Sequence, residues 1–260
     1  MKKSDFTPVI SLAQSIGRKV LSWRNESKSR YIYSKSDFKT EADRRAHDLY
    51  VDQLKVLFTN TDVISEESKG LPDIRPDSYW LIDPIDGTAS WYHGYDGFVT
   101  QAAYISNGIP VFGIIYAPVT EQTWAAVAGE GAYLNGKWLP SLGPSARLIL
   151  TDNTPVPHGV TQGISTSLEA TGYFESGSMG LKAALVADGT VDLFVKDVAV
   201  RDWDMAPAAV ILREVDGLLA LSDGSPYLFD GPFQKDGGFI VARDAELMSC
   251  AIEAFSQLKS

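Results

Sequence analysis

The sequence predicts a mixed α/β fold, and three observations support this. Apolar residues recur at helical spacing over residues 8–23, which is typical of an amphipathic helix. Residues 79–82 form a short uncharged run of aromatic and β-branched side chains, which favours a buried strand. Strand-like runs after residue 98 are separated by Asn-Gly pairs at 107–108 and 135–136, the strongest short-range signal for a hairpin.

The first half of the chain alternates helices and strands. A second helix is expected from Thr40 to about residue 58, with Asp43 in its first turn. A strand at 62–65 ends in Glu66 and Glu67. The meander that follows the buried strand comprises residues 98–106, 109–117, 122–128 and 132–134.

The second half begins after a boundary within residues 140–144, so we expect subdomains at 1–142 and 143–260. A proline-rich loop is predicted at 154–163, and a helix that begins with Gly177-Ser178 follows. Asp204 is well placed as the N-cap of another helix, with Pro207 in its first turn. The remaining elements are strands at 147–151, 191–196, 217–221 and 239–242, helices at 177–188 and 204–214, and a closing helix at 245–258.

Composition narrows the classes of partner. The chain has 260 residues, a hydrophobic content of 45% and a formal net charge of -10. This acidity argues against binding to nucleic acid polymers or anionic membranes, which requires a basic surface. One cysteine and three histidines argue against a disulfide or a zinc site, and with no membrane-length apolar run we expect a cytoplasmic protein.

The run Asp-Pro-Ile-Asp-Gly-Thr at 83–88 carries the main functional signal. A buried strand that leads into Asp83 and Asp86 places two carboxylates at its carboxyl end, where the ligand sites of α/β proteins usually lie. Carboxylates this close repel each other unless a cation lies between them, and Mg²⁺ prefers oxygen ligands. The Ile85 carbonyl is a candidate third ligand. The alternative is an Asp-rich turn that caps the next segment.

Other carboxylates have both structural and functional interpretations. Glu66 would emerge beside Asp83 if strand 62–65 runs parallel to strand 79–82, but it could also be solvated. Asp43 in a first helical turn suits the helix dipole. An Asp-x-Asp-x-Thr nucleophile motif and a Gly-x-Ser-x-Gly elbow are both absent, so the carboxylates are better metal ligands than nucleophiles.

Four motifs in order resemble the inositol monophosphatase superfamily of Mg²⁺-dependent, lithium-sensitive phosphatases. They are Thr-x-x-Asp at 40–43, Glu-Glu at 66–67, Asp-Pro-Ile-Asp-Gly-Thr at 83–88 and Trp-Asp-x-Ala at 203–206. The resemblance implies a layered α/β/α/β sandwich of the inositol monophosphatase and fructose-1,6-bisphosphatase type. It also implies phosphomonoester hydrolysis with direct transfer to water. Members are commonly dimers.

The resemblance also implies roles for individual residues. Glu66, Asp83 and the Ile85 carbonyl would hold one Mg²⁺, and Asp83, Asp86 and Asp204 a second. Glu66 and Thr88 would orient the attacking water, with Asp43 supporting a third, looser ion. The expected substrate contacts are Asp86, Gly87, Thr88, Gly177, Ser178, Lys182, Asp197 and Asp204.

The expected substrate is inositol monophosphate or a related sugar phosphate. In inositol monophosphatases an acidic residue before Trp-Asp binds ring hydroxyls, and Asp197 stands there in place of the usual Glu. Lys182 instead resembles the 3'(2'),5'-bisphosphate nucleotidase branch, unless it is a solvated helix lysine. Histidinol phosphate and fructose 1,6-bisphosphate are further candidates, and a non-catalytic metal- or phosphate-binding regulator is the alternative from a different class.

Overall fold

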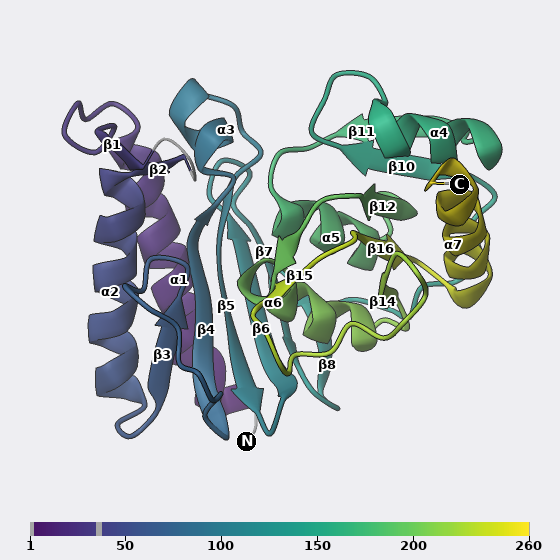
Figure 1. Cartoon of the computed structure of the whole chain (residues 1–260). Helices are drawn as coiled ribbons and strands as arrows, with labels where there is room; N and C mark the ends of the chain where they lie inside the picture. The colour runs from purple at the N-terminus through teal and green to yellow at the C-terminus, as the bar shows by residue number, and fades with distance from the viewer. Residues whose placement is uncertain (1–2, 35–37, 260) are drawn as a thin grey trace.

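The computed structural model describes residues 3–34 and 38–259, and these form stacked layers of helices and sheets (Figure 1). Helices α1 (Lys3–Trp23) and α2 (Glu41–Leu57) cover one face of a seven-stranded sheet. Helices α5 (Met179–Ala187) and α6 (Asp202–Arg213) lie between that sheet and a five-stranded sheet. The predicted α/β/α/β layering is therefore confirmed, and two further helices add an outer layer.

In the seven-stranded sheet, β3 and β4 run in the same direction, so both strands end at the same edge. Strand β3 pairs with β4 in parallel, from Asp62 opposite Tyr79 to Ser65 opposite Ile82, and the remaining pairs are antiparallel. The predicted meander is thus confirmed. The strands in spatial order are β3 (Asp62–Ser65), β4 (Ser78–Asp86), β5 (Val99–Ser106), β6 (Ile109–Ala117), β7 (Gln122–Val127), β8 (Gly131–Leu134) and β9 (Lys137–Trp138).

The smaller sheet mixes parallel and antiparallel pairs and carries an outer pair of helices. Helices α4 (Gly159–Ser167) and α7 (Ala245–Lys259) pack on its outer face (Figure 1). Its strands in spatial order are β11 (Gly172–Glu175), β10 (Ile149–Asp152), β12 (Leu193–Lys196), β16 (Phe239–Ala242) and β14 (Leu218–Leu221). Two short two-stranded sheets also occur in the described structure: β1 (Ile32–Ser34) with β2 (Lys39–Thr40), and β13 (Val200–Arg201) with β15 (Gln234–Lys235).

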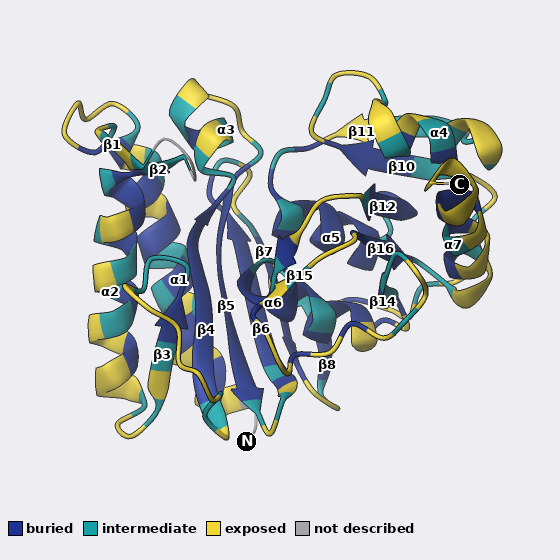
Figure 2. Cartoon of the chain, viewed as in Figure 1, coloured by how far each residue is buried: buried dark blue, intermediate teal, exposed yellow. Residues whose placement is uncertain are grey.

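Burial follows these layers (Figure 2). Strands β4 to β7 are almost entirely buried because helices cover both of their faces. Trp80 and Trp124 are fully buried on opposite faces of this sheet, in different apolar clusters. Each such side chain stabilises the fold by roughly 1.5–3 kcal/mol relative to an exposed one. The sheet is therefore a rigid base for whatever lies at the end of β4.

Several predicted boundaries were wrong. Helix α1 begins at Lys3, five residues before the predicted start, so Pro8 lies inside it. Helix α4 and strand β11 occupy a region in which we predicted only a loop for 154–163 and no strand at 172–175. Strand β4 continues through Asp83 to Asp86, whereas the sequence placed the strand end at Ile82. The subdomain boundary at residue 142 stays a prediction.

Candidate metal centre and active site

Three carboxylates from two elements meet at the end of β4. One oxygen each from Asp83, Asp86 and Asp204 lie within 4.8 Å of one another. The pairing of β4 with β5 shifts register between Asp83 and Asp86, so an irregularity of the ladder separates the two aspartates. Asp204 comes from the first turn of α6 and reaches the same point from the layer between the sheets.

Asp204 is not the N-cap of α6, as the sequence suggested. Arg201 is the N-cap, and Asp204 is the third helical residue. Its Oδ2 accepts a hydrogen bond of 2.9 Å from the backbone N–H of Arg201, as in the second half of a capping box. Pro207 therefore lies in the second turn of the helix, one turn later than predicted. This capping bond fixes the carboxylate of Asp204 toward the centre.

Asp86 is held by neutral donors from α5 and β5. Its carboxylate accepts from the backbone N–H of Met179 at 3.2 Å and of Gly180 at 2.6 Å, the first residues of α5. The side-chain amide of Gln101 lies 3.2 Å from the same carboxylate. A Cβ at Gly180 would lie 2.1 Å from Gln101 Oε1, so a side chain there would displace Gln101 from its present position.

Gln101 is a buried residue of the centre that the sequence analysis missed. Besides Asp86, its Nε2 donates to the carbonyl oxygen of Trp203 at 3.2 Å. That carbonyl has no helical donor because Pro207, four residues on, carries no N–H. Gln101 thus ties β5, the Asp86 carboxylate and α6 together. The only sequence signal was a glutamine inside a mostly apolar strand, and the sequence near Gln101 does not show that it meets a carbonyl left without a donor by Pro207, 106 positions away.

The electrostatics of the triad call for a cation. Burial, and then the negative charges of Glu66, Asp86 and Asp204, raises the pKa of Asp83 well above its usual value. Burial followed by Asp86 and Glu66 has the same effect on the pKa of Asp204. The backbone donors of α5 and the charge of Lys182 partly offset the effect of burial on the pKa of Asp86. A buried set of oxygen ligands with this excess of negative charge fits a hard divalent cation such as Mg²⁺.

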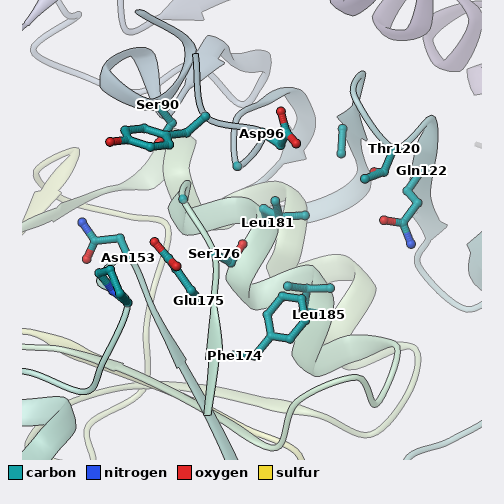
Figure 3. A pocket seen from close by; sticks show the side chains of 15 residues that line it. Ser90, Asp96, Thr120, Gln122, Asn153, Phe174, Glu175, Ser176, Leu181 and Leu185 are labelled. Atoms are coloured by element: carbon teal, nitrogen blue, oxygen red, sulfur yellow. The ribbon is translucent and has the colours of Figure 1, made fainter. Parts of the chain in front are cut away.

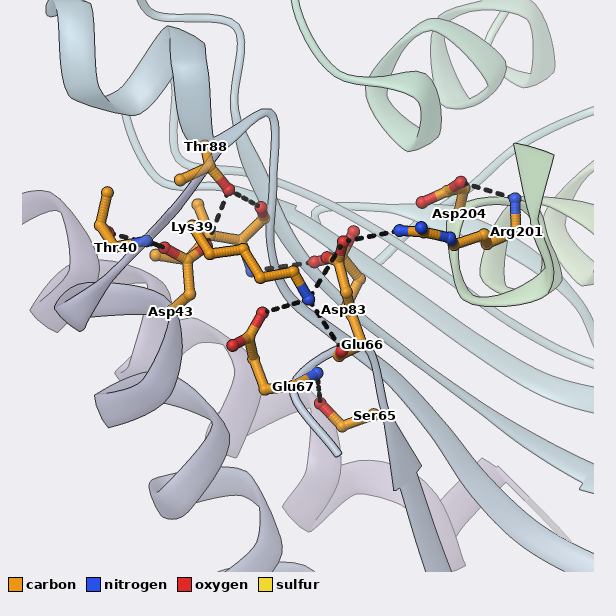
Figure 4. A network of polar contacts seen from close by, with 11 residues as sticks. Lys39, Thr40, Asp43, Ser65, Glu66, Glu67, Asp83, Thr88, Arg201 and Asp204 are labelled. Atoms are coloured by element: carbon orange, nitrogen blue, oxygen red, sulfur yellow. Dashed lines mark hydrogen bonds and ion pairs between the residues drawn. The ribbon is translucent and has the colours of Figure 1, made fainter. Parts of the chain in front are cut away.

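Glu66 lies beside this triad, at the end of β3. The parallel pairing of β3 and β4 that would bring it there is confirmed. Lys39 Nζ lies 3.7 Å from Glu66 Oε1 and Arg201 Nη1 lies 3.5 Å from the same atom (Figure 4). Lys39 also pairs with Glu67 Oε1 at 2.9 Å. Glu66 therefore sits between cations, and neither basic residue was predicted at the site.

Asp43, Thr88 and Ile85 form a second polar group next to the triad. Asp43 accepts from the hydroxyl and the backbone N–H of Thr40, so it lies in the first turn of α2 as predicted. The Thr88 hydroxyl lies 2.7 Å from Asp43 Oδ1 and 3.0 Å from the Ile85 carbonyl oxygen (Figure 4). Burial raises the pKa of Asp43, while these hydrogen bonds oppose the effect. The structure thus joins three predicted site residues from two segments.

Gly87 connects this group to the short helix α3 (Thr88–His93). Its φ of +89° lies in the left-handed region, which a glycine adopts without the strain of a side chain. The backbone of Gly97 and the side chain of Ser178 crowd the same residue. The turn therefore starts α3 directly after β4, and the first backbone N–H groups of a helix have no carbonyl partner within it.

Of the predicted substrate residues in the second half, Asp204 belongs to the triad and Ser178 and Lys182 act on Asp86, whereas Asp197 lies elsewhere. Ser178 caps α5, and its Oγ accepts from the Leu181 N–H at 3.1 Å. Lys182 is only 1% exposed, so the solvated alternative is wrong. Its ammonium donates to the carbonyls of Ser176 and Gly177, and burial lowers its pKa to about 8. Asp197 pairs with Lys259 of α7 at 3.0 Å, away from the triad's own contacts.

A cavity of about 510 Å³ opens between α3 and α5 (Figure 3). Figure 3 shows Ser90 and Asp96 on one side of it, and Leu181 and Leu185 of α5 on the other. Of the predicted site residues, only Gly177 lines this cavity. The hydrogen-bonded contact of Ser178 N–H with the Gly97 carbonyl, at 2.7 Å, forms the adjoining wall. The carboxylate triad is thus not part of this cavity's lining.

The layered fold and the buried carboxylate centre at the end of β4 fit the class of metal-dependent phosphatases. Residues 3–260 match the model of the inositol monophosphatase family, and the chain belongs to that family of phosphate monoester hydrolases. It is 31% identical over 195 residues to a Thermotoga maritima fructose-1,6-bisphosphatase/inositol-1-monophosphatase, covering 70% of this chain and 71% of that protein.

Two further comparisons indicate the range of the relatives. The 3'(2'),5'-bisphosphate nucleotidase CysQ of Aggregatibacter actinomycetemcomitans is 28% identical over 221 residues, covering 81% of this chain and 82% of CysQ. The solved IMPase structure from Thermotoga maritima superposes with a TM-score of 0.82 at 27% identity, covering 99% of this chain and all of that one.

Among the described residues, no helix is both long and apolar enough to cross a membrane.

Proposed function

We propose that this chain hydrolyses inositol monophosphate or a related small sugar phosphate at the Asp83–Asp86–Asp204 centre. The observation that carries the proposal is the convergence of these three buried carboxylates within 4.8 Å. When bound, Mg²⁺ ions would neutralise phosphate charge and acidify a water molecule. Glu66, Asp83 and the Ile85 carbonyl would hold one ion, Asp83, Asp86 and Asp204 a second, and Asp43 would support a third.

The chain's own residues then position the reactants. The Thr88 hydroxyl donates a hydrogen bond of 2.7 Å to Asp43 Oδ1. Its oxygen lone pairs can then accept a hydrogen bond from the attacking water. Glu66 would orient the same water. The backbone N–H groups of Gly87 and Thr88 would receive the phosphate. These residues hold a water and a phosphate in fixed relative positions, which is most of what phosphoryl transfer to water requires.

Substrate choice depends on the second half of the chain. The Lys182 ammonium is buried against the carbonyls of Ser176 and Gly177, and this favours a role in shaping the Gly177-Ser178 turn over contact with a second phosphate. This supports a sugar phosphate over a nucleoside bisphosphate. Asp197 would bind ring hydroxyls if it leaves Lys259. The bisphosphate nucleotidase activity is the alternative that the likeness to CysQ favours.

Phosphate release with Mg²⁺ tests the proposal, with inositol 1-phosphate compared against 3'-phosphoadenosine 5'-phosphate. We expect a higher kcat/KM for inositol 1-phosphate. The reverse preference would assign the chain to the nucleotidases. If neither ester, nor histidinol phosphate or fructose 1,6-bisphosphate, releases phosphate while Mg²⁺ still binds, the non-catalytic regulator becomes the better description.

Lithium inhibition and dimerisation are further expectations. A lithium dose series at fixed Mg²⁺ should lower the rate of phosphate release, since a small monovalent cation would compete for an oxygen-only site. Light scattering after gel filtration should give twice the mass of one chain. Unchanged rates across the series would remove lithium sensitivity from the proposal without affecting the assignment of the reaction.

A further inference from the structure

The environment of Glu66 differs from that of the triad carboxylates because two cationic side chains from different halves of the sequence meet there. Lys39 comes from β2, beside α2, and Arg201 comes from β13, at the start of α6. Both approach Glu66 Oε1, as the dashed lines in Figure 4 show. A carboxylate expected to bind a divalent cation is therefore already paired with two positive charges.

The two cations are held differently. Lys39 Nζ donates to the backbone carbonyl of Glu66 and pairs with Glu67 Oε1, each at 2.9 Å, and only 12% of its side chain is exposed. The contact of Arg201 with Glu66 is longer, at 3.5 Å, and 35% of the Arg201 side chain is exposed. Lys39 is thus fixed in place, whereas Arg201 lies at the solvent side of the centre.

The backbone of Arg201 is fixed even though its side chain is not buried. Its N–H donates to Asp204 Oδ2 at 2.9 Å, and Asp204 belongs to the carboxylate triad. The guanidinium is therefore tethered at the rim of the centre whichever anion it binds. Its planar set of donors suits the oxygens of a carboxylate or a phosphate equally well.

We propose that Arg201 is a further substrate-binding residue that exchanges partners, pairing with Glu66 before metal binds and with the phosphate group of the substrate afterwards. This inference rests on the proposed function. A divalent cation at Glu66 repels the guanidinium and takes over its carboxylate. The incoming phosphate then provides oxygens for the displaced guanidinium. By linkage, Arg201 weakens metal binding in the absence of substrate and strengthens substrate binding in its presence.

Calorimetric titration with Mn²⁺, in the absence of any phosphate, tests the first part of the proposal, in which Arg201 competes with metal for Glu66. Arg201→Gln should bind Mn²⁺ about fivefold more tightly than wild type, the lower end of ordinary coupling between sites. Arg201→Lys keeps a competing charge and should bind Mn²⁺ nearly as wild type does. Arg147→Gln is the matched control, since Arg147 is exposed before β10 and its loss changes the net charge equally.

Inorganic phosphate is the probe for the second part of the proposal, in which Arg201 binds the phosphate group. With Mn²⁺ saturating, Arg201→Gln should bind phosphate roughly tenfold more weakly, as expected for the loss of one charge-assisted hydrogen bond. In the same Arg201→Gln variant, the KM for the substrate should rise by a larger factor than kcat falls. The Arg147→Gln control should match wild type in both titrations.

Specific results would overturn the inference. An Arg201→Gln variant with unchanged or weaker Mn²⁺ affinity would show that Arg201 does not compete with metal. Equal tightening in Arg201→Lys and Arg201→Gln would show a packing effect in place of charge competition. If wild type hydrolyses phosphate esters and these results appear, this inference alone fails. If wild type neither binds Mn²⁺ nor releases phosphate, the proposed function fails and this inference fails with it.

Discussion

Asp86 and Glu66 contribute to one centre, but the chain holds them by opposite means. Asp86 is fixed by neutral donors, namely the N–H groups of Met179 and Gly180 and the amide of Gln101. Glu66 lies between the charged groups of Lys39 and Arg201. Neutral donors fix an orientation without cancelling the carboxylate charge, whereas cations cancel charge and compete with a metal.

This difference implies that the surroundings of Asp86 and those of Glu66 have different roles in the centre. The Asp86 side is enclosed by the N-terminus of α5 and by β5, and only neutral groups of the described residues donate hydrogen bonds to its carboxylate. On the other side, Glu66 is paired with Lys39 and Arg201, and a metal bound there would compete with these two cations. Substitutions on the two sides should therefore differ: those around Asp86 should change geometry and stability, and those around Glu66 should change metal affinity.

Asp83 lies between the two sides, so Asp83→Asn should have the largest effect. We expect phosphate release to fall roughly a thousandfold, equivalent to ~4 kcal/mol of transition-state stabilisation, because both proposed metal positions share this carboxylate. The metal-free variant should unfold at or above the wild-type temperature, since a repelling charge is gone. Asp73→Asn, at an exposed loop position, is the control. Release within tenfold of wild type would refute the assignment of Asp83.

Gly180→Ala breaks the Asp86 side. The added Cβ would lie 2.1 Å from Gln101 Oε1 and 3.1 Å from Asp86 Oδ2, so either the Gln101 side chain must leave its hydrogen bonds or α5 must shift. We expect a loss of about 1–3 kcal/mol in the free energy of unfolding, as for other overpacked cores, together with reduced turnover. Gly143→Ala, which meets nothing within 4 Å, is the matched control. Denaturant unfolding measures both, and equal stability of the two variants would contradict the packing argument.

The pH dependence of the metal-free protein should reveal the uncompensated charge. The pKa values of Asp83 and Asp204 are raised above 3.8 in the folded state, so the folded state binds more protons than the unfolded state. This contribution to stability is complete below pH 3.8 and is lost as the pH rises through the folded values. Thermal melts from about pH 5 to 8 should show wild type losing stability relative to Asp83→Asn as the pH rises.

Saturating Mg²⁺ should reduce this difference in pH dependence, because a bound cation stabilises the ionised carboxylates. The comparison with Asp83→Asn removes contributions from titrating groups elsewhere in the chain. Parallel pH profiles of wild type and Asp83→Asn without metal would show that the triad is not the source of the pH dependence.

Ser178→Ala should have the smallest effect and acts on the Asp86 side alone. It removes the N-cap of α5, whose Oγ accepts from Leu181 N–H, and should cost about 1 kcal/mol of stability. The N–H groups of Met179 and Gly180 then hold Asp86 less firmly, so turnover should fall modestly at unchanged Mn²⁺ affinity. Ser249→Ala, exposed on α7, should change neither quantity. A change in Mn²⁺ affinity for Ser178→Ala would contradict the proposed division between the two sides.

Local sequence was sufficient for much of the centre. The strand that leads into Asp83 and Asp86 and the Asp43 turn were predictable because each depends on residues adjacent in the chain. The strand at 62–65 was predictable too, but its parallel pairing with β4 was only a condition that the structure then met. The ordered motifs resembled one family, which the family match over residues 3–260 then confirmed. Local signals did not reveal α4, whose region is rich in proline and glycine and is stabilised by packing against α7.

What the sequence by itself determined were the ligand types, their order and the strand and helix ends that carry them. Only the tertiary structure decided how their charges are balanced. Gln101 meets the carbonyl that Pro207 leaves without a donor, Lys182 is buried against carbonyls, and Arg201 pairs with Glu66 across 135 positions. The physical reason is that hydrogen bonds and ion pairs depend on distances of a few ångströms between side chains, which packing of the layers sets and sequence separation does not encode.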